Sequence, residues 1–173
     1  MSDSRPIILT ATMEASAQSF FDERRERYFP AERNWLSAHI TLFHALPSEC
    51  RLHLSAILAR QTALTPVIVA SVTKLRNLGS GVAYVVQSEA LAVFRGTLAQ
   101  EFENWLTPQD RQNFSPHVTV QNKATRAEAR LAEAILGAEF SPFKLSIAGV
   151  SVWRYAGGPW VHDADHSFRA PAE

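Results

Sequence analysis

Two short segments of the chain repeat one pattern of histidine, aliphatic residue, threonine, aliphatic residue. They are His39-Ile40-Thr41-Leu42 and His117-Val118-Thr119-Val120. In a β-strand, residues two apart share a face, so each histidine should point the same way as its threonine while the aliphatic residues point to the core. Two histidines across a cleft suit acid-base catalysis, because each titrates near neutral pH. A threonine hydroxyl is a stiffly held donor that suits an anionic tetrahedral group such as a phosphate.

The repeat is longer than these four residues. The segments 32–42 and 110–120 align without a gap, and an acid followed by an arginine precedes each histidine in both. The arginines, Arg33 and Arg111, could contact phosphate or could pair with Glu32 and Asp110 to shape the loops. The extended match favours duplication of a whole loop-strand unit.

The rest of the chain alternates between strand-like and helix-like patterns. Valine-rich segments around the glycines at 79 and 81 predict a hairpin of strands 65–75 and 81–87, and further strands are expected at 6–13, 143–155 and 160–168. Helices are expected over 17–28, after Pro47, over 91–105 and from Thr125, where Thr125 and Glu128 match a capping box and Gly137 would be a C-terminal cap. Because no low-complexity linker separates the halves, we expect residues 1–173 to form a single domain of two lobes that share one core.

Composition excludes several classes of function. The 173 residues carry 17 basic and 17 acidic side chains, so we expect no extended surface for nucleic acid. The one cysteine, Cys50, favours a reducing compartment. Without a signal-like or membrane-spanning apolar stretch, the chain is expected to be cytoplasmic, away from membranes and monomeric.

The paired His-x-Thr-x segments resemble the duplicated signature of the 2H phosphoesterase superfamily, which includes 2′-5′ RNA ligases and cyclic phosphodiesterases. The resemblance implies an α+β fold of two pseudo-symmetric lobes, whose antiparallel sheets flank a central cleft with the helices outside. It also implies metal-independent hydrolysis of a cyclic phosphodiester, such as the 2′,3′-cyclic phosphate of a nucleotide or RNA terminus, or 2′-5′ ligation, without a cofactor. His39 and His117 would then be the catalytic acid-base pair, and Thr41 and Thr119 would bind the phosphate.

Four further residues are candidates for contact with the substrate. Strand alternation extends the cleft face to Phe43 and Gln121, which could stack on a base and read its edge, or could be packing and solvated residues. Lys123 could reach an anion or be solvated at a helix start. Arg154, in a closing strand, is a similar candidate.

Two other functions are compatible with the sequence. The His162-Asp163-Ala164-Asp165-His166 run contains metal-ligand residue types, but an exposed polar hairpin explains it as well, and no metal is expected. The cleft could also belong to a non-catalytic module that binds a nucleotide or another phosphorylated ligand. Two titratable histidines favour the enzyme.

Overall fold

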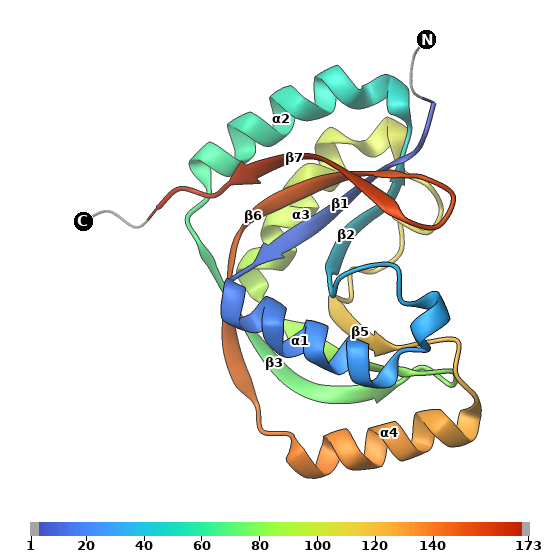
Figure 1. The fold of residues 1–173 in the computed structure, drawn as a ribbon. Helices are drawn as coiled ribbons and strands as arrows, with labels where there is room; N and C mark the ends of the chain where they lie inside the picture. Colours follow the sequence, from blue (N-terminus) through green and yellow to red (C-terminus); the bar gives the residue numbers. More distant parts are fainter. Residues whose placement is uncertain (1–3, 171–173) are drawn as a thin grey trace.

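The computed structural model describes residues 4–170, which form four α-helices and seven β-strands (Figure 1). The helices are α1 (Ala15–Tyr28), α2 (Arg51–Leu64), α3 (Glu89–Glu101) and α4 (Arg126–Glu139). The strands are β1 (Ile7–Met13), β2 (Ile40–Leu46), β3 (Ile68–Asn77), β4 (Val82–Gln87), β5 (His117–Gln121), β6 (Phe143–Tyr155) and β7 (Trp160–Ser167). Short 3-10 turns lie at Ala31–Arg33, Ser48–Cys50 and Glu103–Trp105.

The long strand β6 connects two lobes of one antiparallel sheet. Its first residues pair with β3, and its later residues pair with β1 on one side and β7 on the other. The strand order β2-β1-β6-β3-β4-β5 therefore places the two signature strands, β2 and β5, at opposite ends of the path. The expected α+β fold with antiparallel lobes is confirmed, although the two expected sheets are parts of a single one.

Helices α1 and α3 each pack on a strand of the lobe opposite to the strand that they follow in sequence. Helix α1 follows β1, yet its Phe21 stacks edge-on against Tyr84 of β4. Helix α3 follows β4, yet Phe102 at its end stacks against Phe43 of β2. This exchange joins the two lobes into one continuous hydrophobic cluster.

A β-bulge follows the threonine in each signature strand. In β2, Thr41 pairs with Thr10 and Phe43 with Leu9, which leaves Leu42 as the extra residue. In β5, Thr119 pairs with Ala83 and Gln121 with Val82, which leaves Val120 as the extra residue. An extra residue breaks the two-residue alternation, so the first side chain beyond each bulge, Phe43 or Gln121, turns inward.

The hairpin of β3 and β4, the closing strands β6 and β7, and the capping box at Thr125 are confirmed. The expectation that Gly137 caps α4 is wrong. The helix runs on to Glu139, and Gly137 lies inside it opposite Leu75 of β3. Among residues 4–170, no helix has the length and apolar character that a membrane crossing requires.

We predict that Gly81→Ala destabilises the fold by about 1–3 kcal/mol, because a methyl group there would overlap the backbone carbonyl of Gln121 in β5. Gly96→Ala is the matched control, since it lies in α3 with open space around it and should stabilise by about 0.5–1 kcal/mol. Urea unfolding midpoints measure both. Equal midpoints for the two variants would show that β5 does not depend on this close approach.

Candidate active site

The two signature histidines are held in the same way. His39 Nδ1 lies 2.8 Å from the carbonyl oxygen of Ser37, and His117 Nδ1 lies 2.8 Å from the carbonyl oxygen of Ser115. A carbonyl can only accept, so Nδ1 carries the hydrogen in each ring. Nε2 is then the ring nitrogen available to a ligand, unprotonated in the neutral form and a donor in the charged form.

Two cavities at the cleft each combine a histidine of one signature with the threonine of the other. One cavity of about 500 Å³ is lined by His39 of the first signature and Thr119 of the second. Another, of about 210 Å³, is lined by Thr41 of the first and His117 of the second. All four side chains are half-buried. Each histidine is therefore grouped with the threonine of the opposite signature.

Helix α1 holds both sides of this arrangement. The backbone N–H of Ala38, next to His39, donates to the Asp22 carboxylate at 2.7 Å, and the Ala38 carbonyl accepts from Gln18 at 2.8 Å. One turn later, the buried Arg25 donates to the carbonyl oxygen of Thr119 at 2.8 Å. Hydrogen bonds to charged groups are among the stronger ones in proteins. The helix thus fixes the backbone of His39 relative to that of Thr119.

A second set of bonds fixes β2 from the other side. The buried Arg95 of α3 donates to the carbonyl oxygens of Leu42, at 3.2 Å, and Asp110, at 2.6 Å. The Asp110 carboxylate in turn accepts from the backbone N–H groups of His44 and Ala45. Burial raises the pKa of Asp110, but the hydrogen bond with His44 Nδ1, at 2.9 Å, and those from the two backbone N–H groups outweigh it and hold this pKa below its usual range. The loop before β5 is therefore fastened to β2.

Burial lowers the pKa values of both histidines. That of His39 falls to about 4, where desolvation outweighs the bond to Ser37, and the charge of Arg25 and the proximity of His117 contribute. That of His117 is lowered chiefly by burial and further by the charge of Arg76. The unfolded chain binds the His39 proton more readily, so this residue reduces stability as the pH falls from 6.5 toward 4.

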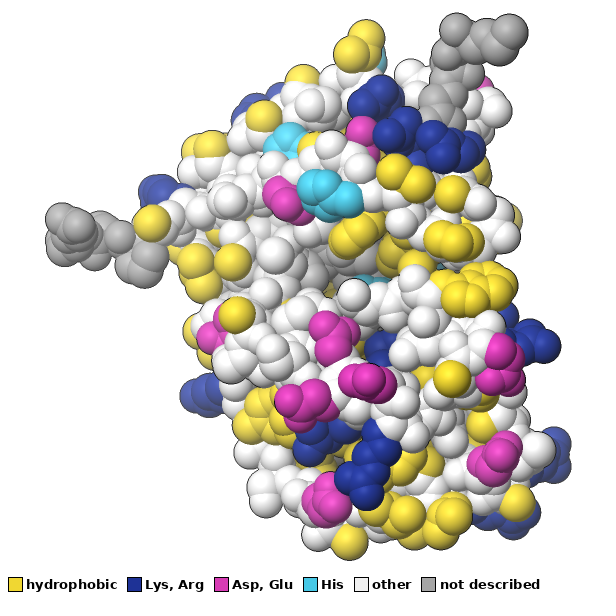
Figure 2. Space-filling view, viewed as in Figure 1, with side chains coloured by type: hydrophobic (Ala, Val, Ile, Leu, Met, Phe, Trp, Pro, Cys, Tyr) yellow, Lys and Arg dark blue, Asp and Glu magenta, His cyan; other side chains and the backbone are white. Residues whose placement is uncertain are grey.

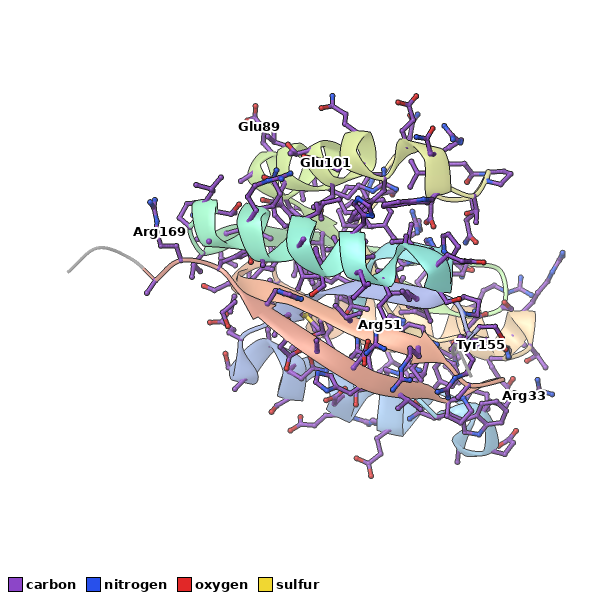
Figure 3. The ribbon with its side chains drawn as sticks, turned by 90° about the horizontal axis from the view of Figure 1, so that it is seen from above. Arg33, Arg51, Glu89, Glu101, Tyr155 and Arg169 are labelled. Atoms are coloured by element: carbon purple, nitrogen blue, oxygen red, sulfur yellow. The ribbon has the colours of Figure 1, made fainter. Side chains whose placement is uncertain are left out.

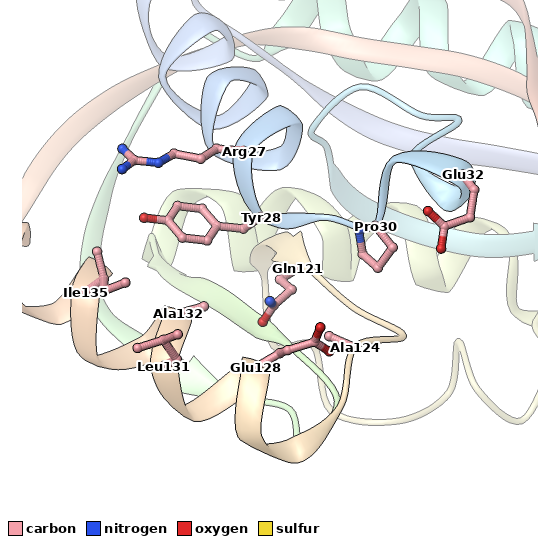
Figure 4. A pocket seen from close by; sticks show the side chains of 10 residues that line it. All are labelled: Arg27, Tyr28, Pro30, Glu32, Gln121, Ala124, Glu128, Leu131, Ala132 and Ile135. Carbon is pink, nitrogen blue, oxygen red and sulfur yellow. The ribbon is translucent and has the colours of Figure 1, made fainter.

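The bulges correct the expectation that Phe43 and Gln121 continue the cleft face. Phe43 is fully buried and packs against Phe102 and under the Arg95 guanidinium. Gln121 is 5% exposed and lines a separate cavity between α1 and α4, beside Tyr28 and Glu128 (Figure 4). Strand alternation failed at both positions for the same reason, the extra residue after each threonine.

The two basic candidates lie in different places. Lys123 lines the same cavity as His39 and Thr119. Arg154 lies away from the described cavities, with Nε 3.7 Å from the Asp163 carboxylate, which also accepts from Arg51 at the start of α2. The neighbouring Trp153 faces the cleft, so alternation along β6 places Arg154 on the other face.

The repeated arginines have diverged. Arg111 donates to the carbonyl oxygen of Glu103, which is a loop role, whereas Arg33 lines the cavity with His39. In the closing hairpin, His162 pairs with Asp165, and Asp163 pairs with Arg51. Within residues 4–170, no three histidine, cysteine or acidic side chains are grouped as metal ligands.

Sequence reasoning missed an aromatic cavity beside His39. Trp35, Trp153 and Trp160 line about 350 Å³, with the Trp160 ring centroid 4.6 Å from that of His39. On the face of the molecule that Figure 2 shows, hydrophobic side chains gather around a hollow near the middle. The available signal was that three of the four tryptophans flank the first signature or lie in the closing hairpin.

The fold and the site define a two-lobed protein with one histidine-threonine pair contributed by each lobe. A family model described as the 2′-5′ RNA ligase superfamily matches residues 13–159, and the chain belongs to this superfamily of 2H phosphoesterases. A search of curated proteins finds no match.

Solved structures share the fold at low sequence identity. TT0787 of Thermus thermophilus is similar with a TM-score of 0.70 and 15% identity, over 96% of this chain and 100% of that one. Escherichia coli LigT, solved with 3′-AMP, is similar with a TM-score of 0.64 and 14% identity, over 96% of this chain and 99% of that one.

We predict that His39 titrates far below the ordinary value of 6.5 in the free protein, and that sulfate raises its pKa by about 1–3 units, because a bound anion favours the charged ring. Sulfate is suitable because it stays dianionic over this range. Histidine NMR titrations with and without sulfate measure both values. Titration of free His39 at 6.5 or above would contradict the prediction.

We also predict that Arg25→Met raises the pKa of His39, because Arg25 is one of the charges that lower it. Arg95→Met removes another buried arginine of the same kind, but Arg95 is not among the groups that act on His39, so the pKa should stay unchanged. The same NMR titration compares them. An equal shift in both variants would assign the effect to general loosening of the fold.

Proposed function

We propose that the protein is a metal-independent phosphoesterase that hydrolyses a cyclic phosphodiester, most naturally the 2′,3′-cyclic phosphate of a nucleotide or an RNA terminus. The observation that carries this proposal is the pair of imidazoles, each anchored through Nδ1 and grouped with the opposite threonine. A single phosphate between the signatures would meet two hydroxyl donors and two ring nitrogens. Membership of the superfamily supports the same class of chemistry.

The reaction follows from general acid-base chemistry. One neutral imidazole takes a proton from water as the water oxygen attacks phosphorus, and the P–O bond to a ribose oxygen breaks. The other imidazole, protonated, gives its proton to that oxygen, so one water is added and a phosphomonoester remains. We assign the base to His39, since its pKa is lowered to about 4 and it stays neutral at pH 7. His117 would then be the acid, recharged by the bound anion.

The aromatic cavity supports a nucleoside as the organic part of the substrate. Bases stack on aromatic side chains with roughly 1–3 kcal/mol each, largely independent of sequence. The Trp153 indole N–H donates to Thr10 at 2.9 Å, which fixes the orientation of one wall. Trp35 lies against Gly158, where any side chain would collide with its ring. The cavity is therefore built around its tryptophans.

We predict hydrolysis of 2′,3′-cyclic nucleotides that resists EDTA, and a loss of roughly 10² to 10⁴ in kcat for His39→Ala or His117→Ala, the usual contribution of a positioned acid or base. His53→Ala, on the exposed side of α2, is the control and should retain activity. Steady-state assays on a nucleotide panel measure this. Full activity in both signature variants would rule out the mechanism.

The same assay across pH should give a bell-shaped profile, because one histidine must be neutral and the other charged. Because the pKa of His39 is lowered to about 4 and that of His117 is also lowered, the rising limb is expected on the acidic side of neutral, and a profile with a single limb between roughly pH 3 and 9 would contradict paired catalysis. Saturable nucleotide binding without turnover would favour the non-catalytic binding module, and turnover lost in EDTA would favour a metal-dependent enzyme. Adding 2′-5′-linked oligonucleotides to the panel tests ligation chemistry.

A further inference from the structure

The cavity shared by His39 and Thr119 is strongly basic. Among residues 4–170, three cationic side chains line it and no aspartate or glutamate does. The three are Arg25, Arg33 and Lys123. This local excess of positive charge contrasts with the formal net charge of zero for the whole chain. Figure 3 shows Arg33 and Tyr155, another lining residue, at the same end of the molecule. A cavity lined by one sign of charge concentrates ligands of the opposite sign.

The three cations differ in how they are used by the fold. Arg25 is buried and donates hydrogen bonds to the carbonyl oxygen of Thr119 and to the side-chain oxygen of Asn34. Arg33 and Lys123 are exposed, and within residues 4–170 their side chains have no ion pair or hydrogen bond. Two free cations at the mouth of a cavity are available to a ligand.

The backbone holds Lys123 in place at some cost. Its φ is 58°, the left-handed region that a side chain other than glycine or asparagine rarely adopts. The Asn122 carboxamide oxygen accepts from the Lys123 N–H at 2.8 Å, and the Ala124 N–H donates to the Ser80 carbonyl. The loop is therefore fixed on both sides of a lysine where glycine would be less strained. The Lys123 side chain therefore extends from a fixed backbone.

The basic cavity and the aromatic cavity meet at His39. Trp35, Leu36 and His39 line both, so a ligand at His39 has aromatic surface on one side and cations on the other. A nucleoside cyclic phosphate with its base against the tryptophans and its phosphate at His39 would leave the basic side empty. The basic side remains for a second anionic group.

We propose that the basic cavity binds a second phosphate of the substrate, through Arg33 and Lys123, so that the protein prefers 5′-phosphorylated nucleoside 2′,3′-cyclic phosphates over unphosphorylated ones. This inference rests on the proposed function and adds the substrate class. It also explains how a chain without net charge selects a polyanion: the recognition is local and takes one additional phosphate rather than an extended strand.

The test compares adenosine 2′,3′-cyclic phosphate with and without a 5′-phosphate. The wild type should show the lower KM for the phosphorylated substrate. Arg33→Gln and Lys123→Asn should each raise that KM roughly fivefold to tenfold with little change in kcat, and should leave the unphosphorylated substrate unaffected. Asparagine tolerates the left-handed backbone, so Lys123→Asn removes the charge without adding strain. Lys144→Gln, exposed on β6 and outside the cavity, is the matched control.

Equal kcat/KM for the two substrates in the wild type, or equal losses on both substrates in the variants, would overturn the second-phosphate site. If neither substrate is hydrolysed, the proposed function fails, and calorimetry then decides the inference separately. Adenosine 3′,5′-bisphosphate should bind more tightly than adenosine 3′-monophosphate, and Arg33→Gln should reduce the difference. Equal affinities of the wild type for the two ligands would overturn the second-phosphate site, whether or not the protein hydrolyses either substrate.

Discussion

The cleft depends on helix α1, which binds the backbone on both of its sides. Asp22 and Gln18 hold Ala38, the residue before His39, and Arg25 holds the carbonyl of Thr119. Because these three side chains lie within two turns of one rigid helix, the separation of the signatures is set by helix geometry rather than by the long path through the sheet. A small error in that separation would misalign the attacking and leaving oxygens.

Arg95 and Asp110 complement α1 on the other side. Arg95 binds the carbonyl of Leu42 at the bulge of β2, much as Arg25 binds that of Thr119 before the bulge of β5. The second repeat contributes Asp110 to hold β2, while the aligned Glu32 is exposed. The two halves thus share a plan of bulged strands and buried arginines, and they differ in the residues that complete it. The basic cavity, with Arg33 and Lys123, lies on one side only.

Local pattern predicts the main strands and helices and the shared face of each signature histidine and threonine, whereas the two-lobed α+β fold class follows from the resemblance to the superfamily. Alternation within a strand is sufficient for His39, Thr41, His117 and Thr119, all of which precede the bulges. It fails for Phe43 and Gln121, because a bulge depends on pairing with a distant strand and leaves no period in its own segment. The tryptophan cavity was missed for a related reason: Trp35, Trp153 and Trp160 come together only when β6 and β7 fold over the first loop. The buried Arg25 and Arg95 did leave a signal, each standing four residues after a buried apolar residue, Phe21 or Leu91.

The proposed mechanism requires His39 and His117 to act on one phosphate. The most direct measurement is an NMR titration of both imidazoles with adenosine 3′-monophosphate. Both signals should shift together, with one common dissociation constant and saturation at one equivalent of ligand. Movement of only one imidazole, or two independent binding constants, would show that the histidines do not share a phosphate and would contradict the mechanism.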